Sequence, residues 1–126
     1  MRTIEEKAII KATIIISKLY NCKHSIISLS NGNFIYVRNK KFDLLMTVCE
    51  TNKTSCIKIE EFRVEEKYRN KGICTNILEL LKDVALKENV KLGLWCEKDN
   101  KKLFNFYSRR GFKYIETLDD DWLEYN

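Results

Sequence analysis

The sequence predicts a single α/β domain, residues 1–126, in which a central sheet with antiparallel and parallel strands is flanked by helices. Two observations lead to this prediction. The chain has the length of one domain and contains no Gly-, Ser- or Pro-rich linker, no repeat and no low-complexity tract. Its second half alternates strand-like and helix-like patterns in the order strand, helix, strand, helix, strand, strand.

The composition narrows the class of protein. With 44% apolar and 33% charged residues, the chain has the composition of a globular protein rather than a disordered one. No segment approaches the roughly 20 apolar residues of a membrane helix. The opening MRTIEEKAIIK is too densely charged for a signal peptide. We therefore expect a cytoplasmic location and no membrane contact.

Cysteine spacing and net charge bear on cofactors and partners. The five cysteines include no CxxC pair and are accompanied by a single histidine, so we expect reduced thiols and no metal site. The formal net charge of +5 suggests an anionic partner, but it is equally compatible with solubility alone.

The first half predicts one helix followed by three strands. Residues 4–20, IEEKAIIKATIIISKLY, place apolar side chains at helical spacings with lysines between them. SIISL and FIYVR then flank SNGN, whose Asn31-Gly32 pair is a strong hairpin signal. DLLMTVCE, residues 43–50, has the composition of a third strand.

The fourth strand, CIKIEEFRV, contains a break in its alternation. Apolar residues alternate up to Ile59 and then resume on the other parity at Phe62. Because side chains alternate strictly along a strand, the break indicates an extra residue, and we expect a β-bulge near Glu60 and Glu61. The alternative is an ordinary edge strand with one polar face.

The second half continues with a helix over residues 73–88 and a strand in VKLGLWC. Asp99 and Asn100 are candidate caps of a further helix, which Gly111 is placed to terminate as a C′ glycine. FKYIET and DWLEY predict two short closing strands.

The junction between the fourth strand and the next helix, VEEKYRNKGICTNIL, is a candidate anion site. A helix that starts near Gly72 directs unpaired N–H groups and the positive end of its dipole outward. Glycine would let a phosphate approach the backbone, and Arg69 and Lys71 could add charge. The alternative is that Gly72 only begins the helix and the basic residues form a solvated rim.

Two motifs together resemble the GNAT superfamily of N-acetyltransferases. In its pyrophosphate-binding segment, a basic or amide residue is followed by glycine at the third position and by a small residue at the fifth; here these are Arg69, Gly72 and Cys74. NKKLFNFYSRRGF is similar to the family's second motif, an Asn, a helix with Phe-Tyr, and a closing Gly-Phe. The resemblance covers residues 56–114. Cys74 departs from the usual glycine or alanine.

The resemblance implies an α/β fold whose bulged strand leads into a pyrophosphate-binding helix, with acetyl-CoA as co-substrate. Backbone groups of the strand would pair with the pantetheine arm, at Phe62, Arg63 and Val64. Backbone amides of the following segment would hold the pyrophosphate, at Arg69, Asn70, Lys71, Gly72, Ile73, Cys74 and Thr75. Asn100 is a further candidate for the pantetheine arm, although a plain helix cap explains it as well.

Catalysis requires removal of a proton, because an amine with a pKa of about 10.4 is protonated at neutral pH and an ammonium cannot attack a thioester. Glu60 is our first candidate for the base, directly or through a water, and Glu61 is the second; the alternative is that both face solvent. A backbone N–H freed by the bulge could stabilise the developing oxyanion. Tyr107 occupies the family's general-acid position; the alternative is a core aromatic.

The sequence therefore predicts an acetyl-CoA-dependent N-acetyltransferase that acts by direct attack of a primary amine. The acceptor, whether a small molecule, a peptide or protein, or an aminoacyl group, is not specified. The alternative is a catalytically degenerate domain that binds CoA or a partner. Direct nucleic-acid binding is disfavoured because the basic turn lacks stacking aromatics and a groove-reading helix. The oligomeric state is left open.

Overall fold

The computed structural model of the chain describes residues 3–29, 32–50, 55–97, 99–115 and 121–125. Its elements, in chain order, are α1 (Ile4–Tyr20), β1 (Lys23–Leu29), β2 (Gly32–Arg38), β3 (Phe42–Glu50), β4 (Ser55–Val64), the 3-10 helix η1 (Glu66–Tyr68), α2 (Ile73–Glu88), β5 (Lys91–Trp95), α3 (Lys101–Arg109), β6 (Lys113–Tyr114) and β7 (Trp122–Tyr125). These elements confirm the predicted mixed α/β architecture.

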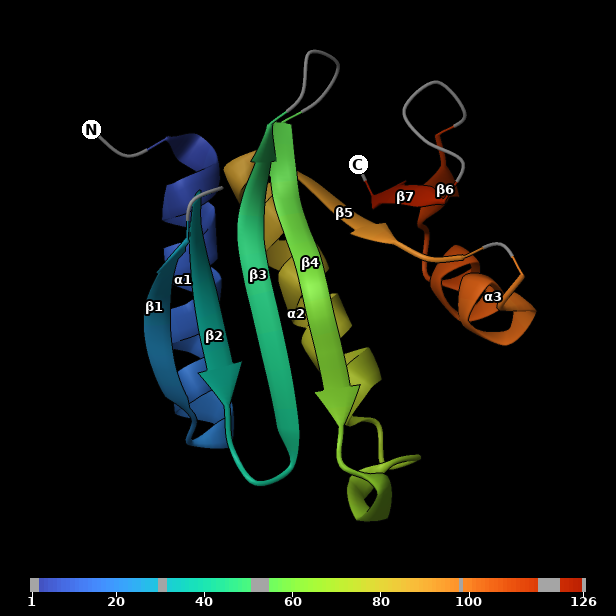
Figure 1. Cartoon of the computed structure of the whole chain (residues 1–126), viewed down its shortest axis with the longest axis horizontal. Helices are drawn as coiled ribbons and strands as arrows, with labels where there is room; N and C mark the ends of the chain where they lie inside the picture. Colours follow the sequence, from blue (N-terminus) through green and yellow to red (C-terminus); the bar gives the residue numbers. More distant parts are fainter. Residues whose placement is uncertain (1–2, 30–31, 51–54, 98, 116–120, 126) are drawn as a thin grey trace.

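The strands form one mixed seven-stranded sheet in the order β1-β2-β3-β4-β5-β7-β6 (Figure 1). Strands β1 to β4 are antiparallel neighbours, β4 and β5 are parallel, and the last three are antiparallel. Helix α2 supplies the crossover that a parallel pair needs. The predicted hairpin is present, with Leu29 opposite Gly32; Ser30 and Asn31 of its turn lie outside the described residues.

The predicted β-bulge lies in β4. Met46 on β3 is opposite Ile59 and the next residue, Leu45, is opposite Glu61, so Glu60 is the extra residue. The bulge resets the alternation of side chains. As a result Ile59, before it, and Phe62, after it, both pack against the same core.

Strands β4 and β5 separate beyond the bulge. Their ladder ends where Ile59 is opposite Leu94, whereas β4 continues to Val64 (Figure 1). The last residues of β4 therefore have a ladder partner on the β3 side only. This separation opens the sheet next to the start of α2.

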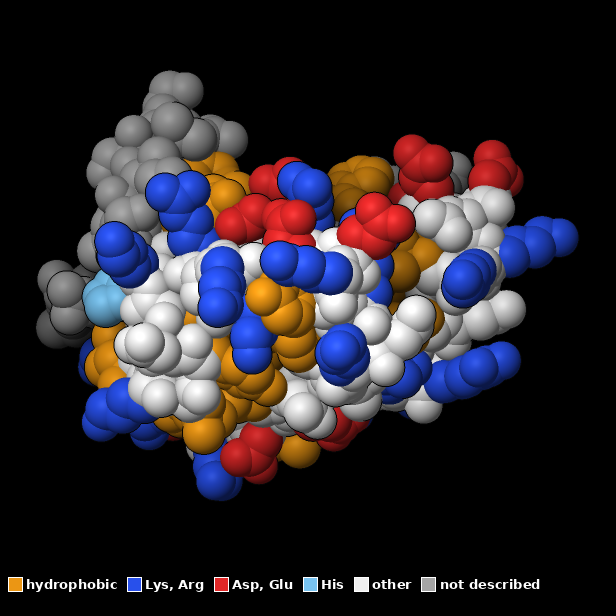
Figure 2. Space-filling view, turned by 90° about the horizontal axis from the view of Figure 1, so that it is seen from below, with side chains coloured by type: hydrophobic (Ala, Val, Ile, Leu, Met, Phe, Trp, Pro, Cys, Tyr) orange, Lys and Arg blue, Asp and Glu red, His pale blue; other side chains and the backbone are white. Residues whose placement is uncertain are grey.

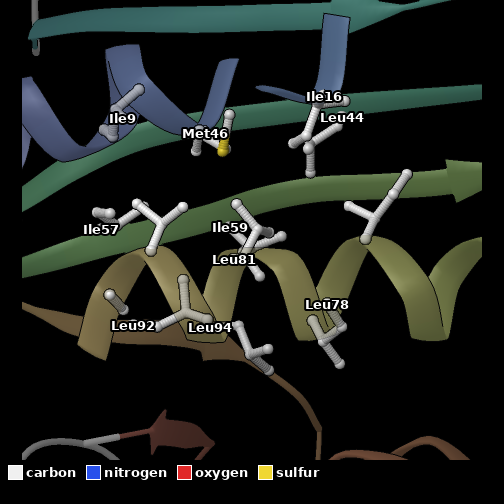
Figure 3. Packing of buried hydrophobic residues seen from close by; sticks show 14 of the residues in the cluster. Ile9, Ile16, Leu44, Met46, Ile57, Ile59, Leu78, Leu81, Leu92 and Leu94 are labelled. Carbon is white, nitrogen blue, oxygen red and sulfur yellow. The ribbon is translucent and has the colours of Figure 1, made fainter. Parts of the chain in front are cut away.

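The core lies between the sheet and the helices α1 and α2, which lie side by side on one face of β1–β4 (Figure 1). Figure 3 shows side chains from α1, β3, β4, α2 and β5 meeting in this layer. Fully buried Ile16, Leu44 and Leu81 each come from a different element. The apolar residues of α1 and α2 recur with the helical period, so each helix buries one face against the sheet. This packing fixes the position of the start of α2 relative to the end of β4.

No helix within the described ranges is long and apolar enough to cross a membrane. Predicted local features are confirmed at the ends of α3: the Asn100 side chain accepts from the backbone N–H of Leu103, and Gly111 follows the helix at φ +95°. The backbone N–H of Phe112 donates to the carbonyl of Tyr107, as in a Schellman ending.

Candidate functional site

A groove of about 670 Å³ lies where β4 separates from β5, a volume in the range of small-molecule sites. It brings together three segments that are distant in sequence. They are the end of β4, the loop and first turn of α2, and one face of α3. The lining residues are Phe62, Arg63, Val64, Tyr68, Arg69, Asn70, Gly72, Ile73, Cys74, Thr75, Leu103, Phe106, Tyr107 and Arg110.

The N-terminus of α2 lies in this groove without a side-chain cap. Helix α1 begins with a capping box between Thr3 and Glu6, and α3 is capped by Asn100. Helix α2 instead begins at Gly72, with no side-chain hydrogen bond and no acidic residue in its first turn. Unpaired N–H groups and the positive end of the helix dipole therefore meet the groove, an arrangement that suits an anion.

Gly72 keeps this end of the helix open. Its φ of +83° is a left-handed conformation that favours glycine, and a Cβ placed there would meet only Asn76 Nδ2, at 3.9 Å. Asn70, two residues earlier, also has a positive φ, 63°. The tight turn brings the side chain of Arg69 back to β4, where its Nε donates to the Val64 carbonyl at 2.8 Å.

The opposite wall comes from β4. Beyond Ile59 the strand has no β5 partner, and Phe62, Arg63 and Val64 line the groove. Because successive backbone groups of a strand point alternately to either side, this edge can pair with amides of an extended ligand.

Tyr107 closes the inner part of the groove from α3. It is 8% exposed, and its ring packs edge-on against Phe106 and Phe112. Burial, with smaller contributions from the thiols of Cys74 and Cys96, raises the pKa of Tyr107 well above its ordinary value. A tyrosine phenol is neutral at physiological pH in any case, and the raised pKa keeps it able to donate a hydrogen bond at alkaline pH as well.

Residues 26–112 match the model of the Acetyltransferase (GNAT) family, which confirms the resemblance seen in the two motifs. The chain belongs to this family. No curated protein sequence gives a significant match.

Solved structures agree with the GNAT assignment at the level of the fold. A GNAT family acetyltransferase from Staphylococcus aureus Mu50 is 18% identical, with 100% of this chain and 94% of that chain covered and a TM-score of 0.54. Arabidopsis thaliana Naa50, in complex with the bisubstrate analogue CoA-Ac-MVNAL, is 18% identical over 98% and 93% of the two chains, with a TM-score of 0.52.

PH1933 from Pyrococcus horikoshii OT3 is 23% identical with a TM-score of 0.53, and the match covers 72% of this chain and 61% of that one. The GNAT chain thus spans less than two thirds of the length of PH1933. At these identities the likeness is one of fold.

Arg110 is a groove residue that the sequence patterns do not reveal. Its guanidinium donates to the Phe106 carbonyl at 2.8 Å and to Thr75 Oγ1 at 3.3 Å, and lies 3.6 Å from the centroid of the Phe106 ring. Its Nε is buried with no hydrogen-bond partner among the described residues. Arg110 thereby joins the end of α3 to the first turn of α2. The only local signal is its position directly before Gly111.

Cys74, in the first turn of α2, also lines the groove. Burial raises the pKa of its thiol, and the nearby positive charge of Arg110 partly offsets this increase. The side chains of Cys22, Cys56, Cys74 and Cys96 are free thiols. No group of three or more metal-ligating side chains occurs within the described part of the chain.

Three predicted site residues lie outside the groove lining. Lys71 is exposed beside it, and Asn100 caps α3. Glu60, at the bulge, forms an ion pair with Lys58 at 3.0 Å, where both side chains are mostly shielded from solvent. The roles of all the predicted site residues in binding or catalysis stay predictions.

Proposed function

We propose that this GNAT chain is an acetyl-CoA-dependent N-acetyltransferase in which a primary amine attacks the thioester directly. The observation that carries the proposal is the uncapped, glycine-initiated N-terminus of α2, which faces the same groove as the free edge of β4 and Tyr107. Family membership and the CoA-containing ligand named for Naa50 support it.

Successive segments of the groove match successive parts of acetyl-CoA. Residues Arg69 to Thr75 would hold the pyrophosphate, because the N–H groups in the first turn of α2 are free and lie at the positive end of the helix dipole. The backbone N–H of Arg69 already donates to the Glu66 carbonyl at 3.2 Å, so Arg69 would contribute the charge of its side chain instead. The edge of β4 from Phe62 to Val64 would pair with the pantetheine amides, although the Val64 carbonyl already accepts from Arg69 Nε. The bound thioester supplies an activated acetyl group, and holding it beside the amine removes most of the entropic cost of bringing the two together.

An acceptor ammonium must lose a proton before it attacks. We assign this step to Glu60, directly or through a water, with Glu61 as the alternative. An incoming ammonium would compete with Lys58 for the Glu60 carboxylate. The ion pair also favours a second candidate function, a domain that binds CoA or a partner without catalysis. In such a domain the Glu60 carboxylate stays paired with Lys58 and does not act as a base.

Departure of the CoA thiolate would be assisted by Tyr107. Because its raised pKa disfavours loss of its own proton, we assign the neutral phenol the role of hydrogen-bond donor to the developing thiolate. A backbone N–H near the bulge is proposed to stabilise the negative charge that develops on the carbonyl oxygen.

The acceptor is proposed to be an amine on a small molecule, a peptide or protein, or an aminoacyl group. The peptide portion of the analogue named for Naa50 supports a peptide among these classes. A cytoplasmic location is part of the same proposal, since acetyl-CoA is an intracellular metabolite.

Isothermal titration of acetyl-CoA into Gly72→Glu tests the cofactor site. The wild-type chain is expected to bind, and the new carboxylate should lower affinity at least about 100-fold because it repels phosphates at the helix end. Gly72→Gln is the matched control, since it carries the same backbone strain and side-chain size without the charge. Equal affinities of the Glu variant and the wild type would show that Gly72 begins the helix without being part of the cofactor site.

Thiol release from acetyl-CoA, measured with polyamines, free peptide N-termini and lysine peptides, tests for turnover. Release above background with any of these amines is expected if the chain is a transferase. Tight binding of acetyl-CoA together with background release for every acceptor would instead support the binding-only function.

A further inference from the structure

A second hollow, of about 570 Å³, lies where α1 ends and the turn between β2 and β3 begins. Lys23, Arg38, Lys40 and Lys41 line it together with a single carboxylate, Asp43. We call this hollow the basic cleft. Figure 2 views the end of the molecule that carries this turn and shows Lys and Arg side chains spread across it.

The basic cleft contains one like-charge pair that is unfavourable for the isolated protein. Lys23 is directly opposite Arg38 in the ladder between β1 and β2, and Arg38 is opposite Asp43 in the next ladder. Like charges in directly opposed positions destabilise a sheet. Asp43 offsets only part of this repulsion, since one carboxylate faces four cations in the lining. The excess of positive charge suits the binding of an anion.

The cations of the basic cleft are also free of ion pairs. Among the described residues, none of the four has a carboxylate oxygen within 4.0 Å, whereas Lys11, Lys82 and Lys87 on the two long helices are each paired. These cations therefore keep their full charge for a ligand.

Hydrogen bonds from one side chain hold the cleft in shape. Asn39 Oδ1 accepts from the backbone N–H groups of Lys41 and Phe42 at 2.7 and 3.0 Å. Its Nδ2 donates to the Tyr20 carbonyl at 2.9 Å, which ties the β2–β3 turn to the end of α1. The backbone of the turn is thus held in place before a ligand binds, which lowers the entropic cost of binding.

We propose that the basic cleft binds an acidic peptide segment of a partner protein. A strand of nucleic acid fits less well, because single-stranded binding relies on free aromatic faces. Near the cleft, Arg38 lies over Tyr36 and Lys41 lies over Tyr68, while Tyr20 packs edge-on to Phe42 in the core. Carboxylate side chains need only the cations.

The site goes beyond the proposed acetyl transfer, because it shares no lining residue with the cofactor groove. The two are nevertheless neighbours. Lys41 of the cleft lies 5.5 Å from the ring centroid of Tyr68, which lines the groove. A partner held in the cleft would therefore lie next to the cofactor site.

Fluorescence anisotropy with a labelled peptide of alternating Glu and Ser tests the proposal on the full chain. The double variant Lys23→Gln/Arg38→Gln removes the opposed cations, and Lys7→Gln/Lys87→Gln removes the same charge from helix positions at the opposite end of the molecule. We expect at least about tenfold weaker binding for the first variant and a change of less than about twofold for the second. The Gln-for-Glu peptide should not bind.

Thermal unfolding shows whether the first variant remains folded. Its melting temperature should stay close to that of the wild type, because loss of the like-charge pair offsets loss of the Arg38–Asp43 pairing and of the contact between Arg38 and Tyr36. Three results would overturn the proposal: equal weakening in both variants, no binding of the Glu peptide by the wild type, or tighter binding of a uridine oligonucleotide that is lost in the first variant. Retained acetyl-CoA binding in that variant separates the cleft from the cofactor groove.

Discussion

At the scale of single residues, Tyr107 on α3 and Arg110, the C-cap residue of that helix, both line the groove. Tyr107 stays neutral even at alkaline pH because burial raises its pKa, whereas Arg110 holds a permanent charge beside Thr75. The groove lining therefore holds a neutral hydrogen-bond donor and a permanent cation next to each other.

Tyr107→Phe should lower turnover by about 10- to 100-fold if the phenol donates to the thiolate, with less effect on the KM for acetyl-CoA. Since the Tyr107 pKa is raised, wild-type turnover should show no loss from phenol ionisation up to about pH 10, and the rise with pH should follow the acceptor amine. Steady-state kinetics, measured for the wild type and the variant as a function of pH, check both points. Tyr36→Phe is the control, because Tyr36 lies outside the groove and the turnover of this variant should not change. Unchanged turnover in Tyr107→Phe would show that Tyr107 serves only as an aromatic residue of the core.

Arg110→Met should slow the alkylation of Cys74 by iodoacetamide several-fold, as followed by mass spectrometry of the peptide that contains it. The positive charge lowers the thiol pKa, so removing it raises that pKa and reduces the thiolate fraction. Arg110→Lys retains the charge and should react at nearly the wild-type rate. If Met and Lys variants react equally fast, the charge of Arg110 does not act on Cys74.

At the scale of elements, the site depends on how β4 and β5 meet and then part. They pair only from Cys56 to Ile59 on β4, and Gly93 on β5 lies opposite Lys58 within this short ladder. The ring of Trp122 from β7 covers Gly93 closely, since a Cβ there would lie 2.2 Å from Trp122 Cζ2. Glycine at this position thus lets β7 pack against β5 beside the point of separation.

Gly93→Ala should destabilise the fold by about 1–3 kcal/mol, because the added methyl group overlaps the indole and the packed sheet cannot move freely. Urea unfolding gives the change in free energy. In a double-mutant cycle Trp122→Leu should recover part of the loss caused by Gly93→Ala. Strictly additive effects of the two substitutions would show that the close contact does not limit stability.

At the scale of the whole molecule, α1 is part of the same core as the site. Ala8, Ala12 and Ile16 are fully buried under the sheet, and Lys11 forms an ion pair with Glu88 at the end of α2. The family match begins at residue 26, after this helix. Helix α1 nevertheless supports the strands and the helix that carry the groove.

Ile16→Ala should lower the free energy of unfolding by about 2–5 kcal/mol, because it leaves a cavity between α1 and the sheet. Ile14→Ala is the matched control: the same substitution in the same helix, at a side chain 47% exposed, should change stability by less than about 1 kcal/mol. Chemical denaturation measures both. Similar losses in the two variants would contradict the proposed packing of α1.

Local patterns in the sequence were enough for the elements and for part of the site. The period of apolar residues predicts α1 and α2, the break in alternation predicts the bulge at Glu60, and Gly72 marks the open helix end. Each depends on neighbours within a few positions of the chain, where backbone geometry repeats regularly. The family motifs added Tyr107, which the structure places in the groove.

Only the tertiary structure decided which distant side chains meet. Arg110 bonds to Thr75, which lies 35 residues earlier, and Lys41 of the basic cleft lies over Tyr68 of the groove. These contacts depend on strand register, on the separation of β4 from β5, and on the docking of α3, all of which result from packing across long stretches of chain. A sequence pattern carries no direct signal of such pairings, so the groove wall and the basic cleft emerge only from the fold.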